Sequence, residues 1–247
     1  MSESLGRQQI RTLSEFAGGL MQPDQCSEAE PIRTQFDPAD IREPLRWLSK
    51  PHGRFFYKKG RPICVAGEMW NIAHPASARF PSPVFSSRWT GRFDGRWAKR
   101  VGLGNVEAFV TEAFQVTGSD FGFLTTEVDL KFKNTSPTRH SFEGFDMAKG
   151  LPGLYWVNLF SDGLGRWLEL STFPQQLASL RRLAGGGWLL QFCELPDHCR
   201  DIDLLQKQRA AIEWLGDDKF FDIRCPEREA RVPNWDRAPF RDVESSA

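Results

Sequence analysis

The segment Gly150–Phe160 constrains the fold more than any other part of this chain. Its sequence is Gly-Leu-Pro-Gly-Leu-Tyr-Trp-Val-Asn-Leu-Phe. Pro152 fixes its backbone φ angle and the two glycines tolerate positive φ, so Gly150–Gly153 is predicted to form a turn. Leu154–Phe160 is rich in aromatic and aliphatic residues, which predicts a strand. Because the segment holds no nucleophile, metal ligand or phosphate-binding loop, we expect it to be part of the scaffold.

Apolar patterns elsewhere predict both helices and strands. Apolar residues at i, i+3, i+4, i+7 and i+8 predict a helix over Val106–Phe114, and a similar stripe predicts one over Asp201–Leu215. Strict alternation over Asp120–Lys133 predicts a long strand with one buried and one wet face. Residues 54–66 predict a hairpin. Without regular βαβ alternation, this pattern favours a single α+β domain. Its largely antiparallel sheet of about six strands is expected to carry amphipathic helices on it.

Three regions are expected along the chain. Residues 1–35 are polar and weakly patterned, which predicts a flexible N-terminal lead-in. Residues 36–223 are expected to form the α+β domain. Residues 224–247 are charged and contain proline, so they are predicted to be a tail on the surface.

Composition argues against several classes of protein. Lys and Arg number 32, as do Asp and Glu, and this balance argues against a dedicated nucleic-acid binder. The five cysteines are scattered without a Cys-x-x-Cys pair, which favours a reducing compartment. The N-terminus lacks the apolar core of a signal peptide, and no apolar run approaches the ~18 residues that span a bilayer. We therefore expect a cytoplasmic protein without a membrane partner.

Candidate catalytic and metal-binding residues are few. Cys193-x4-His198-Cys199 is the one local cluster of soft ligands, and it lacks the second pair that a zinc site usually has. No signature of a cysteine nucleophile surrounds any cysteine, and Gly102-x-Gly104 lacks the third glycine of a dinucleotide-binding fingerprint. The sequence predicts no catalytic residue, no metal and no cofactor. An enzyme or small-molecule-binding domain, with a pocket among Trp156, Trp188 and the cysteines, stays open as an alternative.

Residues 79–100 repeat an arginine followed by an aromatic residue. The pairs are Arg79-Phe80, Arg88-Trp89, Arg92-Phe93 and Arg96-Trp97. With Lys99 and Arg100, six positive charges face only Asp94, a net charge of +5. The simplest interpretation is that the aromatic rings enter the core while the arginines stay in water. A protein interface at Arg88, Arg92 and Arg96 is a second interpretation, and nucleic-acid binding by phosphate contact and stacking is a third.

Residues 102–130 carry the opposite charge and no Lys or Arg. Their acidic residues are Glu107, Glu112, Asp120, Glu127 and Asp129. Glu127 and Asp129 are predicted to share the wet face of one strand. Such a run is either a solvated surface or an acidic patch that meets a basic partner through electrostatic complementarity. The candidate partner-binding residues here are Glu127, Asp129, Glu112 and Asp120.

The motif at Gly150–Phe160 resembles the signature of bacterial polymorphic-toxin immunity proteins, most closely the Immunity protein 52 family. The order of the other pieces is similar too, over about residues 40–223. A helix leads into Asp120-Phe-Gly-Phe-Leu-Thr-Thr, and a glycine-rich turn and strand follow the motif at residues 185–192. Glu213-Trp-Leu-Gly and Lys219-Phe-Phe-Asp222 close the pattern. The chain departs from it at Ser161-Asp-Gly-Leu-Gly165, where a glycine and a continuing segment are expected.

This resemblance implies a non-enzymatic protein that binds a cognate toxin and blocks it in the producing cell. Toxins paired with such proteins are exported by type VI or contact-dependent secretion, and many are nucleases. A nuclease toxin would present a basic cleft, which makes Glu127 and Asp129 the first candidates for contact with it.

Overall fold

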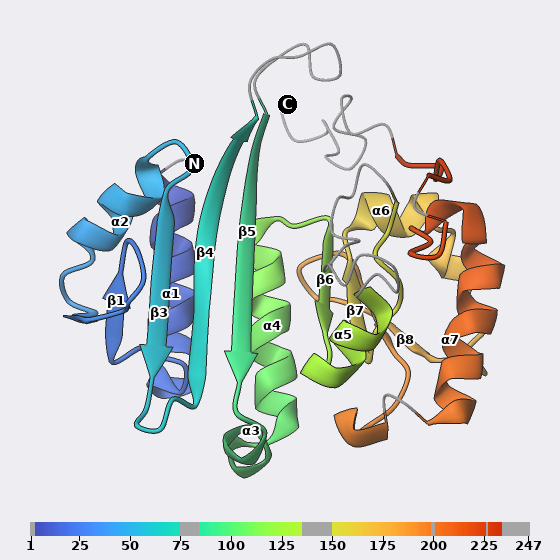
Figure 1. Cartoon of the computed structure of the whole chain (residues 1–247), viewed down its shortest axis with the longest axis horizontal. Helices are drawn as coiled ribbons and strands as arrows, with labels where there is room; N and C mark the ends of the chain where they lie inside the picture. Colours follow the sequence, from blue (N-terminus) through green and yellow to red (C-terminus); the bar gives the residue numbers. More distant parts are fainter. Residues whose placement is uncertain (1–2, 75–83, 135–149, 199–200, 226, 234–247) are drawn as a thin grey trace. The chain divides into compact units, whose positions relative to one another are not determined.

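The computed structural model describes residues 3–74, 84–134, 150–198, 201–225 and 227–233. These ranges contain seven α-helices and nine strands (Figure 1). The protein is α+β, as predicted, but its strands form two antiparallel sheets instead of one sheet of about six strands. The chain divides into two compact units, Met1–Ser119 (unit 1) and Asp120–Ala247 (unit 2), so this boundary falls inside the stretch predicted as one domain.

Unit 1 contains a five-stranded sheet with the order β2-β1-β3-β4-β5. The predicted hairpin is present as β3 and β4, and β5 extends the sheet beside β4. The strands are β1 (Gln25–Ser27), β2 (Thr34–Gln35), β3 (Arg54–Lys59), β4 (Val65–His74) and β5 (Val84–Phe93).

Four helices accompany this sheet, namely α1 (Glu3–Gly19), α2 (Arg42–Ser49), α3 (Gly95–Val101) and α4 (Leu103–Thr117). The helix predicted around Val106–Phe114 is confirmed as α4, which ends at the left-handed Gly118. The predicted flexible lead-in is wrong, because α1, β1 and β2 all lie within it. Ile10 and Leu13 of α1 are fully buried, so their apolar contacts fix this segment against the rest of unit 1.

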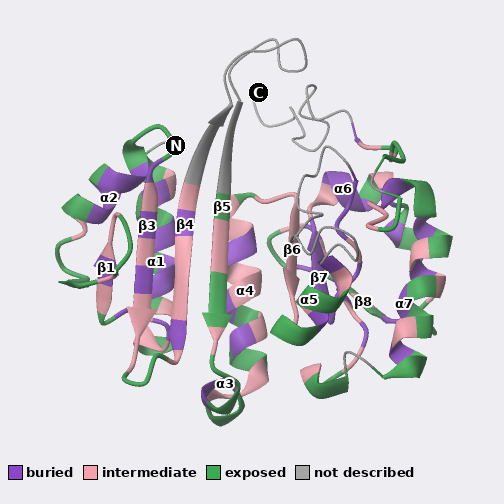
Figure 2. Cartoon of the chain, in the orientation of Figure 1, coloured by how far each residue is buried: buried purple, intermediate pink, exposed green. Residues whose placement is uncertain are grey.

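One face of the unit 1 sheet forms the core with the helices. Phe55 and Tyr57 of β3 are buried, and Figure 2 shows buried and partly exposed residues alternating along this strand. Trp89 of β5 donates its indole N–H to the Tyr57 hydroxyl at 2.8 Å, and its ring lies edge-on to Phe109 of α4. Phe93 stacks on the buried Trp97. The aromatic residues of these Arg-aromatic pairs therefore turn inward, whereas Arg79-Phe80 lies outside the described residues.

Unit 2 contains a four-stranded sheet with the order β6-β7-β9-β8. Its strands are β6 (Phe121–Leu124), β7 (Val157–Phe160), β8 (Ser179–Arg182) and β9 (Trp188–Gln191). Its α-helices are α5 (Glu127–Asn134), α6 (Asp162–Trp167) and α7 (Ile202–Leu215). The described residues of unit 2 also form three short 3-10 helices: η2 (Leu170–Thr172), η3 (Pro196–His198) and η4 (Asp217–Lys219). The predicted helix over Asp201–Leu215 is thus confirmed as α7. The predicted surface tail is described only up to residue 233.

The Gly150–Phe160 motif lies in the core of unit 2. All four residues of β7 are buried, and the preceding Trp156 is 3% exposed. Gly150 has a φ of +117°, and an added Cβ would lie 2.8 Å from the backbone nitrogen of Phe221. The backbone N–H of Leu151 donates to the Lys219 carbonyl at 2.9 Å, and the Leu151 carbonyl accepts from the backbone N–H of Phe221 at 2.9 Å. The motif therefore joins β7 to a segment about 60 residues later in the chain.

The long strand predicted over Asp120–Lys133 is wrong. The chain forms β6 up to Leu124 and then turns into α5. The Thr126 hydroxyl accepts a hydrogen bond from the backbone N–H of Asp129 at 3.1 Å, as an N-capping residue does. Ion pairs then join residues four apart, Glu127 with Lys131 and Asp129 with Lys133. These local interactions favour a helix and outweigh the alternating apolar pattern.

Candidate functional site

The candidate site is the side of the unit 1 sheet opposite the core, here called the outer face. Strand side chains alternate between the two faces, so the residues between the buried ones point outward. Figure 1 shows α1 and α4 behind β3, β4 and β5, and no helix described in unit 1 lies in front of these strands. The outer face of these three strands comprises Arg54, Phe56, Lys58, Ala66, Glu68, Trp70, Arg88, Thr90 and Arg92.

The strand register arranges these side chains in three rows across the sheet. Directly opposed residues on antiparallel strands have Cα atoms about 4.5–5.5 Å apart, so each row is a set of neighbours. Four cations and one carboxylate occupy this small area. The rows are Arg54–Trp70–Arg88, Phe56–Glu68–Thr90 and Lys58–Ala66–Arg92.

The first row places an aromatic ring between two arginines. The Arg54 guanidinium lies 4.0 Å from the centroid of the Trp70 ring, a cation–π contact. Arg88 pairs with Trp70 from the other side and is exposed. The indole nitrogen of Trp70 is buried without a hydrogen-bond partner in the described part of the chain. The row therefore presents an ordered guanidinium group and an exposed one beside a large ring.

The other two rows differ in how available their charges are. In the last row, Lys58 donates to the backbone carbonyl of Ile32 at 2.7 Å, so this ammonium group already has an acceptor within unit 1. Arg92 at the other end of that row is exposed. Glu68 stands in the middle row and is partly exposed. The positive character of the outer face therefore comes mainly from its three arginines.

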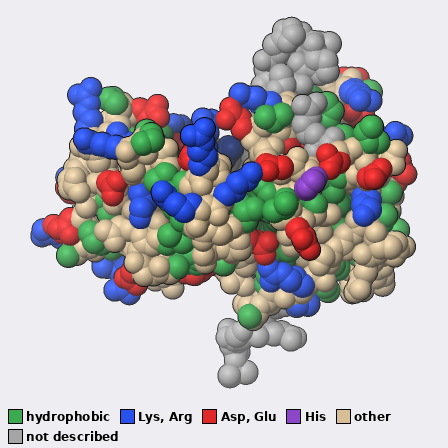
Figure 3. Space-filling view, turned by 90° about the horizontal axis from the view of Figure 1, so that it is seen from below, with side chains coloured by type: hydrophobic (Ala, Val, Ile, Leu, Met, Phe, Trp, Pro, Cys, Tyr) green, Lys and Arg blue, Asp and Glu red, His purple; other side chains and the backbone are tan. Residues whose placement is uncertain are grey.

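The structure brings together two of the three predicted basic residues. Arg88 and Arg92 are four residues apart on β5, so they share the outer face. Arg96 instead lies on α3, a helix that begins after Asp94, whose carboxylate accepts from the Trp97 N–H at 2.9 Å. Figure 3 views the molecule from the end where α3 lies and shows Lys and Arg side chains there. The exposed basic residues of α3 are Arg96, Lys99 and Arg100.

Sequence analysis did not identify Arg54 and Trp70 as parts of this surface. Arg54 lies on β3 and Trp70 on β4, far along the chain from Arg88. The signal that could have found them is the alternation along the β3–β4 hairpin, continued onto β5. That inference needs the pairing register, which a single sequence does not show.

The predicted acidic residues do not form one patch. Glu112 lies on α4 in unit 1 and accepts a hydrogen bond from Thr12 of α1 at 3.2 Å. Asp120 belongs to unit 2 and accepts from the Ser161 hydroxyl at 3.0 Å. Glu127 is exposed but pairs with Lys131 of its own helix at 2.6 Å. These residues serve mainly local contacts within their own units.

Asp129 is buried, with no exposed surface, so its prediction as a surface contact is wrong. Its carboxylate accepts from Thr125 at 2.6 Å and pairs with Lys133 at 2.9 Å. The Lys133 ammonium also donates to the Leu154 carbonyl and to the Gln208 side chain, each at 2.8 Å. The pair therefore connects α5 with α7 and with the start of the Gly150–Phe160 motif.

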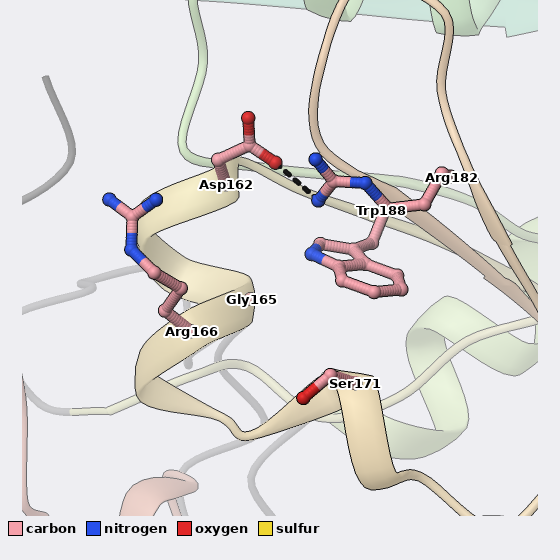
Figure 4. A pocket seen from close by; sticks show the side chains of 6 residues that line it. All are labelled: Asp162, Gly165, Arg166, Ser171, Arg182 and Trp188. Atoms are coloured by element: carbon pink, nitrogen blue, oxygen red, sulfur yellow. Dashed lines mark hydrogen bonds and ion pairs between the residues drawn. The ribbon is translucent and has the colours of Figure 1, made fainter. Parts of the chain in front are cut away.

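A cavity of about 460 Å³ lies beside α6 in unit 2. It is lined by Asp162, Gly165, Arg166, Ser171, Arg182 and Trp188, shown in Figure 4. Arg182 forms an ion pair with Asp162 at 2.5 Å, and its guanidinium lies 4.5 Å from the Trp188 ring centroid. Figure 4 shows Arg166 directed away from these three side chains. The polar groups are thus paired with each other or diverge, and they do not converge on a common point.

The sequence cluster around Cys193 is located at the surface of unit 2. His198 Nδ1 lies 2.7 Å from Asp201 Oδ2, and this hydrogen bond raises the pKa of His198. The Cys193 thiol donates a hydrogen bond to the Leu195 backbone carbonyl. Cys199 lies outside the described residues. Trp156 donates to the Cys193 carbonyl at 2.6 Å and is buried, and it is not among the residues that line the cavity beside Trp188.

The described residues hold neither a cluster of metal ligands nor a helix that could span a membrane. No group of three or more His, Cys, Asp or Glu side chains is arranged there to hold a metal ion. Within the same residues, every helix is too short or too polar to cross a membrane.

Comparisons with known proteins add no relative. No protein-family profile matches the chain, and neither curated proteins nor solved structures include a significant match.

Proposed function

We propose that this is an immunity protein, which binds a cognate bacterial toxin in the cytoplasm of the producing cell and neutralises it. The observation that carries this proposal is the outer face of the unit 1 sheet, which holds cationic and aromatic side chains and is not covered by the helices described in that unit. The likeness of the Gly150–Phe160 motif to immunity proteins supports the same function.

The residue types of the outer face suit protein recognition. Arginine and tryptophan are enriched where protein interfaces derive most of their binding energy. A guanidinium group can bind a carboxylate through two parallel hydrogen bonds, which gives specificity as well as affinity. Arg54 and Arg88 provide two such groups beside Trp70, and Arg92 provides a third in another row of the same face. Binding of a toxin surface here would block whatever part of the toxin it covers.

Co-expression tests this proposal. The protein is produced together with each secreted-toxin candidate encoded beside its gene. We expect one toxin to stop growth when expressed alone, to be harmless in co-expression, and to elute with the protein in gel filtration. Growth rescue without a complex, or no rescue by any candidate, would refute the proposal.

Single-stranded nucleic acid is a second candidate ligand for the same surface. An open sheet face with aromatic and basic side chains can stack bases and contact phosphates. The row Arg54–Trp70–Arg88 is the observation that favours this alternative. A mobility shift with a single-stranded oligonucleotide, weakened strongly by added salt, would support it.

A further inference from the structure

We infer that the outer face recognises an acidic protein surface whose carboxylates pair with Arg54, Arg88 and Arg92. This inference rests on the proposed function and specifies the chemistry of the partner. It depends on the positions of the three guanidinium groups, on the order imposed by Trp70, and on the place of Glu68 among them.

The strand geometry defines the spacing of the carboxylates. Arg54 and Arg88 lie in one row on strands that flank β4, so their backbones are about 10 Å apart. Arg88 and Arg92 are four residues apart on β5, a separation of about 13 Å along the strand. A matching partner thus presents at least three acidic side chains at these spacings. A single acidic residue would engage only one of the arginines.

Trp70 reduces the entropy cost of binding at one of these positions. Its ring lies against the Arg54 guanidinium at 4.0 Å, which restricts a long side chain that would otherwise sample many rotamers. A preordered guanidinium loses less conformational freedom when it donates hydrogen bonds to a carboxylate. The same contact occupies part of the ring surface on which a nucleic-acid base would stack.

Glu68 favours a protein over a nucleic acid as the partner. It lies in the middle row, between the row of Arg54 and Arg88 and the row of Arg92. A phosphate backbone crossing from one row to the next would approach this carboxylate and be repelled. A protein can place acidic side chains opposite the arginines and a hydrogen-bond donor opposite Glu68.

Binding of two defined probes tests the inference. The full-length protein is titrated into fluorescent poly-L-glutamate and, separately, into fluorescent single-stranded oligo(dT) of 20 nucleotides. The variant Arg88→Glu/Arg92→Glu reverses two charges on the outer face. The control Arg100→Glu/Lys207→Glu makes the same change in charge at exposed positions on α3 and α7. Circular dichroism compares the folds of all three proteins.

We expect poly-L-glutamate to bind the wild type and the control equally, and to bind the face variant at least tenfold more weakly. Glu68→Gln is expected to tighten that binding several-fold, because it removes a repelling charge. Equal binding by the face variant and the control would overturn the inference. The inference would also be overturned if the wild type bound oligo(dT) more tightly than poly-L-glutamate and the face variant lost this oligo(dT) binding. If the face variant unfolds, Arg88→Gln/Arg92→Gln replaces it, with an expected weakening of at least threefold.

The toxin complex separates failure of this inference from failure of the proposed function. If no neighbouring toxin binds the wild type, the proposed function fails. If a toxin binds the wild type and also binds Arg88→Glu/Arg92→Glu equally well, the function stands and the assigned surface is wrong.

Discussion

Replacing Lys133 by methionine is expected to destabilise unit 2 severely. Asp129 is fully buried, and Lys133 is the one cation that pairs with it among the described residues. The substitution would leave a buried carboxylate without its counter-charge, and would remove donors from the Leu154 carbonyl and Gln208. Breaking a buried ion pair from one side costs about 3–5 kcal/mol. With a urea dependence of about 2 kcal/mol per molar, the unfolding midpoint should fall by about 1.5–2.5 M.

The chain supplies a matched control on the same helix. Lys131 pairs with Glu127 four residues away, as Lys133 pairs with Asp129, but both partners are more than half exposed. Exposed pairs of this kind contribute less than about 1 kcal/mol, so Lys131→Met should barely move the midpoint. Urea unfolding followed by circular dichroism compares the two variants. Equal shifts would refute the reasoning that burial makes the Asp129–Lys133 pair important.

A double variant separates loss of the pair from loss of packing. Asp129→Asn/Lys133→Met removes both charges and keeps a side chain that can bond Thr125. We expect it to be more stable than Lys133→Met alone, because no uncompensated charge remains buried. A double variant as unstable as the sum of both single changes would show that the two side chains act independently.

Three further outcomes follow from local contacts. Gly165→Ala should cost about 1–3 kcal/mol in unfolding free energy, because the new Cβ would lie 2.2 Å from Trp188. Gly104 lies on α4, and a Cβ added there would meet no atom within 4 Å. Gly104→Ala should therefore raise the unfolding free energy by about 0.4–1 kcal/mol. If thermal melts show both alanine variants shifting the melting temperature in the same direction, this reasoning is contradicted. The raised pKa of His198 means that its bond to Asp201 stabilises fully below the ordinary value of 6.5 and is lost as the pH rises through the raised pKa. An NMR titration should show a midpoint above 6.5 that falls in Asp201→Asn, and an unchanged midpoint would contradict the assigned cause.

Elements with strong local signals were predictable from the sequence. The apolar stripe of α4 and its terminal Gly118, the hairpin of β3 and β4, and the helix α7 all occur where the patterns placed them. Each of these elements is set by side-chain periodicity and by turn residues within about 15 positions of one another. The division into two sheets depends instead on contacts between distant strands, which periodicity does not encode.

The segment of α5 shows why an alternating pattern can mislead. Val128, Leu130 and Phe132 alternate with charged residues, which predicted a strand with a wet face. In the structure Val128 and Phe132 are more than half exposed, whereas Asp129 is buried. A pattern based on hydrophobicity predicts that the charged residues face water. The signals for a helix are the capping position of Thr126 and the two ion pairs between residues four apart. The strand prediction depends on the rule that charged residues stay exposed, and the buried Asp129–Lys133 ion pair is an exception to that rule.

The candidate surface was predictable only in part, because the sequence does not show the register in which the strands pair. Arg88 and Arg92 are four residues apart, so any strand through this segment places them on one face. Arg54 and Trp70 join them because β3 pairs with β4 in one register and β4 with β5 in another. A shift of either register by one residue would move Trp70 or Arg54 to the opposite face. The surface therefore depends on the core residues that fix the register, above all Tyr57 of β3. Its hydroxyl accepts a hydrogen bond from the indole N–H of Trp89 on β5, across the intervening strand β4. Substitutions at the arginines can change the partner without disturbing that core, whereas a change at Tyr57 would affect both.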